Sequence, residues 1–166
     1  MSMRLGTRAK YTLRLMMAIG RLAEQRRPVS LGEVARHCGI SRRYLEQLVV
    51  SLRHADLLRG RSGRGGGYLL SRPASEIRIG EIIEAAIGPI TISECVTKAD
   101  TCMQSSFCQC RLLWQLIDHR IDEVLNEYSL ADLIDHRWTA RAHRDLEQHG
   151  ARVTGACPTA PQIANH

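Results

Sequence analysis

Residues 40–70 read I-S-R-R-Y-L-E-Q-L-V-V-S-L-R-H-A-D-L-L-R-G-R-S-G-R-G-G-G-Y-L-L, and this stretch decides the fold. Ser41 is a typical helix cap. The apolar residues that follow it have helical spacing and should face inward: Leu45, Leu48, Val49 and Leu52. Two short apolar segments, 57–58 and 68–70, then flank a loop of glycine and arginine. The stretch therefore predicts a capped helix followed by a β-hairpin.

The residues upstream complete a helix-turn-helix pattern. Apolar positions predict a helix over residues 7–25, which Thr7 could cap. Ser30 opens a second helix, with Glu33 completing a capping box, and Gly39 ends it. A short helix, a glycine turn and a Ser-capped helix are typical of a helix-turn-helix, and a hairpin after it is a wing. Residues 1–74 are thus predicted to be a winged helix-turn-helix DNA-binding region.

Charge divides the chain into two unequal parts. The net charge is +6, but residues 1–74 hold 15 Lys and Arg against 4 Asp and Glu, a net of +11. Residues 75–166 hold 8 against 13, a net of −5. A basic region beside a mildly acidic one favours one module that binds a polyanion and a second with another task.

The predicted DNA contacts lie on the recognition helix and on the wing. On the helix they are Ser41, Arg42, Arg43, Tyr44 and Gln47, at the N-terminal end that enters the major groove. On the wing they are Arg59, Arg61 and Arg64, in a glycine-rich loop suited to a narrow minor groove. The simpler alternative is a solvated basic surface. A phosphate-binding nucleotide loop is disfavoured because the G-x-x-x-x-G-K-[ST] pattern is absent.

A second candidate functional site is the cysteine segment, residues 94–114. Cys95, Cys102 and Cys108 have the spacing C-x6-C-x5-C, and Cys110 follows two residues later. Zinc sites favour closer pairs, so these gaps better suit a loop around an iron–sulfur cluster, of the 2Fe–2S or 4Fe–4S type. A zinc site or a set of free thiols is the alternative. The fourth ligand is open. The candidates are Cys110, Asp100, Glu94, His119, a residue of a partner chain, and a small thiol or solvent.

The remaining chain predicts helices and a tail. Residues 76–87 are predicted to be a helix, and a longer helix should begin at Arg111. Residues spaced 3, 4, 3, 4 along it predict a helix–helix seam: Trp114, Ile117, Ile121, Val124 and Tyr128. Residues 75–137 would then hold the cluster loop and the dimerisation helix, and 138–166 a disordered tail. With no membrane span or signal-peptide pattern, we expect a cytoplasmic protein.

These motifs together resemble the family of iron–sulfur cluster regulators typified by IscR, NsrR and RirA. The resemblance covers residues 3–137. It rests on M-R-L at the start, I-S-R-R-Y-L-E-Q-L, G-R-G-G-G-Y-L-L, I-x-I-G-E-I-I-E-A and the cysteine segment ending in L-L-W. It implies a mostly α-helical, winged-helix homodimer that binds pseudo-palindromic double-stranded DNA and ligates a cluster through Cys95, Cys102 and Cys108.

The chain departs from that family at the fourth ligand. IscR-type members place a histidine three residues after the third cysteine, where this chain has Arg111. NsrR-type members use an acid of the partner's first helix, where this chain has Lys10. The sequence thus predicts a cluster-dependent transcription regulator that senses iron, redox state or nitric oxide. A zinc or thiol-redox regulator of the same fold is the alternative, and an electron-transfer or iron–sulfur enzyme domain is disfavoured by the DNA-reading parts.

Overall fold

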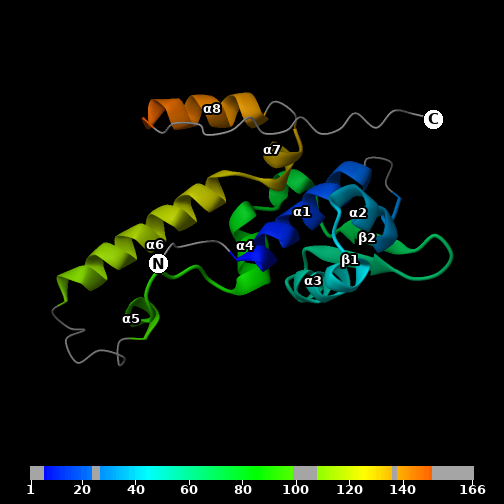
Figure 1. Ribbon diagram of the computed structural model, residues 1–166, viewed down its shortest axis with the longest axis horizontal. Helices are drawn as coiled ribbons and strands as arrows, with labels where there is room; N and C mark the ends of the chain where they lie inside the picture. Colours follow the sequence, from blue (N-terminus) through cyan, green and yellow to red (C-terminus); the bar gives the residue numbers. More distant parts are fainter. Residues whose placement is uncertain (1–5, 24–26, 99–107, 136–137, 151–166) are drawn as a thin grey trace. The chain divides into compact units, whose positions relative to one another are not determined.

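The computed structural model describes residues 6–23, 27–98, 108–135 and 138–150 of the chain, which forms two compact units, residues 1–134 and 135–166. The described part of the first unit is mostly α-helical, with one antiparallel pair of strands (Figure 1). Its elements are α1 (Thr7–Leu22), α2 (Leu31–Cys38), α3 (Arg42–His54), β1 (Leu58–Arg61), β2 (Gly67–Leu70), the 3-10 turn η2 (Ala74–Glu76), α4 (Ile79–Ile87), α5 (Glu94–Thr97), α6 (Gln109–Glu127) and α7 (Leu130–Ile134). The predicted class, mostly α with a small wing, is confirmed.

Side-chain caps set the boundaries of α2 and α3. The Ser30 hydroxyl accepts from the backbone N–H of Glu33 at 3.3 Å, and the Glu33 carboxylate accepts from the backbone N–H of Ser30 at 2.8 Å. Gly39 ends α2 with φ 65°, a left-handed conformation that favours glycine. Ser41 then caps α3 by accepting from the N–H of Tyr44 at 3.4 Å. The capping box and the glycine turn confirm the predicted helix-turn-helix.

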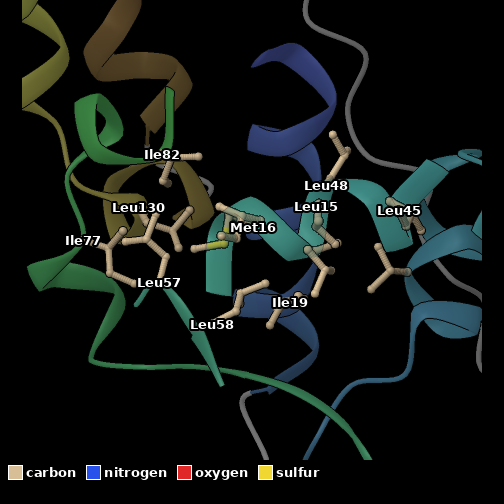
Figure 2. Packing of buried hydrophobic residues seen from close by; sticks show 14 of the residues in the cluster. Leu15, Met16, Ile19, Leu45, Leu48, Leu57, Leu58, Ile77, Ile82 and Leu130 are labelled. Atoms are coloured by element: carbon tan, nitrogen blue, oxygen red, sulfur yellow. The ribbon is translucent and has the colours of Figure 1, made fainter. Parts of the chain in front are cut away.

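The core is built around α1. Leu15, Met16 and Ile19 of this helix are fully buried. Figure 2 shows them between side chains of α3 on one side and side chains that include Ile77 and Leu130 on the other. Full burial of each such side chain stabilises the fold by about 1.5–3 kcal/mol. The four apolar positions predicted to face inward from α3 are all buried. The same core therefore supports both the helix-turn-helix and α4 with α7.

The wing is a hairpin with an additional bridge at its base. β1 pairs with β2 in antiparallel register, with Leu58 opposite Leu70 and Arg61 opposite Gly67. Val29, which precedes α2, donates to the Tyr68 carbonyl at 2.9 Å and accepts from the Tyr68 N–H at 2.8 Å. Figure 1 shows the turn between the strands extending beyond the helices. The hairpin is thus held beside the helix-turn-helix by backbone hydrogen bonds.

The start of α4 and the end of α6 are joined by backbone pairing. The N–H of Ile79 donates to the Tyr128 carbonyl at 3.1 Å, and the N–H of Leu130 donates to the Ile77 carbonyl at 2.8 Å. Beyond this junction α6 contains no buried residue. Figure 1 shows α6 running from the junction towards α5. One end of α6 is therefore fixed in the core, whereas most of its length is exposed.

Helix α1 begins at Thr7, as predicted, but its cap residue and two other predicted helix starts differ from the structure. Gly6, not Thr7, occupies the cap position of α1, and no side chain caps it. The helix predicted from residue 76 begins at Ile79, because the Glu81 carboxylate accepts from the backbone N–H of Arg78 at 2.7 Å. The helix predicted from residue 111 begins at Gln109.

The prediction of a disordered tail over 138–166 is wrong for its first part. Helix α8 (Trp138–Gln148) forms in the second unit. Its sequence is rich in Ala, Arg, Leu, Glu and Gln, whose helix propensity outweighs the low apolar content that suggested disorder. Residues 151–166 lie outside the described part. Within the described residues, no helix combines the length and the apolar character that a membrane crossing requires.

Candidate DNA-binding surface and cysteine segment

The outer face of α3 carries exposed polar side chains at helical spacing. Arg43 and Gln47 are four residues apart and both exposed, on the side away from the buried leucines. Arg42 is also exposed and forms an ion pair with Glu46, with 3.1 Å between its Nε and a carboxylate oxygen. Arginine and glutamine in such positions can make bidentate hydrogen bonds to guanine and adenine. The predicted base-reading residues therefore do lie together on one accessible surface.

Ser41 and Tyr44 were predicted to contact DNA, and both also make contacts within the chain. The Ser41 hydroxyl caps α3. Tyr44 is half-buried, and its ring meets Tyr11 of α1 edge to face, with 5.9 Å between ring centroids and an interplanar angle of 82°. Arg14 lies over the Tyr11 ring at 5.9 Å. These contacts fix the N-terminal end of α3 against α1, which orients the recognition face.

The wing presents its arginines to solvent. Arg59 and Arg61 are two residues apart on β1, so their side chains leave the same face of the hairpin. Arg64 lies in the turn, between Gly63 and Gly65, whose φ angles of 100° and 78° favour glycine. All three arginines are exposed. A thin turn with exposed guanidinium groups has the shape and charge suited to a narrow groove of DNA.

Two titratable groups in this region have shifted pKa values. The pKa of Glu33 is lowered to about 2, first by the backbone N–H of Ser30 and then by Arg27, which lies 2.8 Å from its carboxylate. Burial raises the pKa of the Cys38 thiol, whose sulfur lies 3.7 Å from the Arg14 carbonyl oxygen. Cys38 is half-buried between α1 and α2, as expected of a packing residue.

The cysteine segment begins and ends on two helices that pack against each other. Cys95 lies in α5, is half-buried, and has its sulfur 3.1 Å from the Ser93 hydroxyl oxygen. Cys108 is the half-buried cap residue of α6. Helices α5 and α6 are in contact, and the N–H of Ile92 donates to the Asp118 carboxylate at 2.9 Å. Cys102, predicted as the middle ligand, lies outside the described residues.

The donor chemistry of this segment fits an iron–sulfur cluster. Within the described residues no three Cys, His, Asp or Glu side chains converge on one point. However, two thiols flank the chain that holds the third, and thiolates are the usual protein ligands of such clusters. The N-terminal end of α6, where Cys108 is the cap residue, also suits an anionic group. These residues could hold a cluster with three cysteine ligands.

The candidates for a fourth ligand are unequal in position. Cys110 is exposed in the first turn of α6, two residues from Cys108. His119 lies on the same helix nine residues beyond Cys110, about 14 Å along its axis, since each residue rises about 1.5 Å. His119 also pairs with Glu123 at 3.3 Å. Position therefore favours Cys110 over His119.

The predicted seam is a partly covered apolar face of α6, in which Val124 is exposed and the other four residues are half-buried. Ile117, Ile121 and Val124 line a groove together with Leu116 and Leu125. Trp114 lies on the same helix and is half-buried. Tyr128, by contrast, packs against the core of its own chain. The surface from Leu116 to Leu125, called the α6 groove below, thus contains three of the five predicted seam residues.

Comparison with known proteins places the chain in a family. The model of the Rrf2 family, described as an iron-dependent transcriptional regulator, matches residues 5–136. The chain belongs to the Rrf2 family. The HTH-type transcriptional regulator IscR of Serratia proteamaculans is 36% identical to it over 135 residues, which are 81% of each chain.

Solved structures of two kinds resemble this Rrf2 chain. The global cysteine regulator CymR of B. subtilis has a TM-score of 0.65 and 32% identity, covering 80% of this chain and 97% of its own. IscR of T. potens has a TM-score of 0.64 and 27% identity, covering 93% and 95%. The resemblance drawn from the motifs is therefore confirmed at the level of the family. As a member of it, the chain is a DNA-binding transcription regulator and not an enzyme.

Proposed function

We propose that this Rrf2 regulator acts as a homodimer whose binding to a pseudo-palindromic operator is controlled by an iron–sulfur cluster held by Cys95, Cys102 and Cys108. The observation that carries the proposal is the packing of α5 against α6. This packing brings the helix of Cys95 to the helix that follows Cys108, at the two ends of the segment that contains Cys102.

The family and the donor set support the cluster. The family description names iron dependence, and the motif resemblance is to regulators that carry iron–sulfur clusters. Thiolates suit iron, and three in one segment meet most of the ligand requirement of a 2Fe–2S or 4Fe–4S cluster. When bound, the cluster would supply a centre that responds to iron supply, redox state or nitric oxide.

A continuous set of contacts leads from the cysteine segment to the DNA-binding surface. The C-terminal end of α6 pairs with the start of α4 through Ile79 and Tyr128. Glu81 of α4 forms an ion pair with Arg72, which follows the second strand of the wing. At the other end of α4, the Ala86 carbonyl accepts from Arg8 of α1 at 2.6 Å. A shift of α6 would therefore reach both the wing and α1 through α4.

The similarity to CymR favours a second candidate function. That relative is titled a global cysteine regulator. Cys110 is exposed and could take part in thiol chemistry. A zinc-binding or thiol-redox regulator of the same fold would use the same segment without a cluster.

Metal analysis of protein purified without oxygen separates these functions. The proposal predicts a brown protein that contains iron and acid-labile sulfide and bleaches in air. Cys102→Ala should lose the visible absorption and keep a folded dimer, whereas Cys38→Ala, at a cysteine outside the segment, should keep the colour. A colourless wild-type protein that contains zinc, or no metal, would replace the proposal with the second candidate.

A further inference from the structure

One apolar side chain is exposed on the outer face of the recognition helix. Val50 of α3 is 54% exposed. Over the described residues from α1 to β2, no other large apolar side chain is comparably exposed. The other exposed ones in the described chain lie on α4, α6 and α8. The basic DNA-binding surface therefore contains a single apolar position.

Val50 lies in line with the predicted base-reading residues. It follows Gln47 by three residues and Arg43 by seven, so the three side chains share one face of the helix. This face is opposite Leu45 and Leu52, which are fully buried. With a rise of about 1.5 Å per residue, Arg43 and Val50 are about 10 Å apart along the axis, close to the length of three base pairs.

Val50 contributes little to the stability of the folded chain in this position. Valine is β-branched and a weaker helix former than alanine, leucine or glutamine. More than half of its side chain remains in water, so burial does not offset this loss. An apolar contact in the complex with DNA would remove that surface from water.

We propose that Val50 contacts the 5-methyl group of a thymine in the major groove of the operator. Thymine is the one base of unmodified DNA that presents an apolar group there, next to the O4 acceptor. Arg43 and Gln47 suit guanine and adenine, so the three side chains together would read a guanine, an adenine and a thymine within one half-site. The inference rests on the proposed operator binding. It adds that Val50 selects a thymine within each half-site.

Replacement of thymine by uracil tests the contact, because it removes the methyl group alone. The probe is the duplex that the wild-type holoprotein selects from random double-stranded DNA, with each thymine replaced in turn by uracil. When one particular thymine of each half-site is replaced, the affinity of the wild-type protein should fall about four-fold. This factor corresponds to the free energy of burying one methyl group. Val50→Ser should bind the thymine and uracil duplexes equally at that position. Val50→Thr, which differs from the serine variant by one methyl group, should keep the discrimination.

The outcomes distinguish the contact from the binding itself. If Val50→Ser loses as much affinity as the wild type when each thymine is replaced, Val50 does not read the methyl group and the inference is overturned. A wild-type protein that selects no duplex at all would overturn the operator binding on which the inference rests. Circular dichroism of both variants checks that the helices are unchanged, as expected for an exposed position.

Discussion

Val29 and Tyr68 exchange two backbone hydrogen bonds, of 2.9 and 2.8 Å, and so join the residue before the α2 cap to the second strand of the wing. This bridge joins the wing to the start of the helix-turn-helix through backbone groups. It brings the two backbones close at Gly67, where a Cβ atom would lie 2.5 Å from the Val29 carbonyl oxygen. The wing and the start of the helix-turn-helix are therefore coupled through one short backbone contact.

Replacing Gly67 with alanine should disrupt this bridge. The backbone of Val29 must move to accept a Cβ atom, and we expect a loss of about 1–3 kcal/mol in the free energy of unfolding. Urea denaturation measures this loss, and operator affinity should fall with it. Gly60→Ala is the matched control, since its Cβ would make an ordinary contact of 3.6 Å with the Tyr68 ring. Equal stabilities of the two variants would show that the bridge does not constrain the wing.

Substitutions in the recognition helix and in the wing should have different effects on DNA binding. Arg43→Ala or Gln47→Ala should relax the preference at one base pair, at a cost of about 1–3 kcal/mol. Arg61→Ala or Arg64→Ala should weaken binding to most sequences, and most where the minor groove is narrow. Affinities for a set of single-base operator variants test both statements. Four variants that all bind more weakly without any change in base preference would refute the assignment of grooves.

The Glu33 capping box should make stability depend on acid pH. Because the pKa of Glu33 falls from 4.5 to about 2 in the folded chain, its hydrogen bonds stabilise the fold above pH 4.5. This contribution is lost as the pH falls from 4.5 towards 2. Glu33→Gln removes the titration, so wild-type protein should lose about 1 kcal/mol more than this variant between about pH 5 and 3. Urea midpoints that fall in parallel for both proteins would contradict the shift.

The α6 groove should be the dimer contact. Ile117→Asp would bury an unpaired carboxylate there, which costs several kcal/mol, so the dimer dissociation constant should rise by about 100-fold or more. Gln115→Asp adds the same charge to the opposite face of α6 and should leave the dimer intact. Sedimentation equilibrium measures both. An unchanged association of Ile117→Asp would move the dimer contact elsewhere.

Local patterns predicted the DNA-binding half of the chain well. Ser30, Glu33 and Gly39 determine helix ends through contacts within four residues, so the helix-turn-helix could be inferred from their order. The bridge between Val29 and Tyr68 could not, because it joins backbones 39 positions apart and depends on no particular side chain. Tyr44 was assigned to DNA because it lies in the recognition helix, whereas its packing on Tyr11 is a tertiary contact.

The cysteine segment was predictable in composition but not in geometry. The three thiols and their spacing indicated a soft metal site, and the structure adds that the helices of Cys95 and Cys108 pack together. The start of α6 two residues before the predicted one places Cys110 inside a helix rather than in an extended chain. Helix α8 was missed because its polar sequence resembles a disordered tail, although its residues are good helix formers.

Operator affinity measured before and after removal of the cluster, without oxygen, tests most directly whether the cysteine segment controls DNA binding. Cluster-loaded and cluster-free wild-type protein should differ in Kd by about ten-fold or more, equivalent to about 1.4 kcal/mol of coupling. Cys102→Ala should show one Kd whatever the treatment, equal to that of the cluster-free wild type. The same Kd for wild-type protein with and without its cluster would contradict cluster control of this regulator.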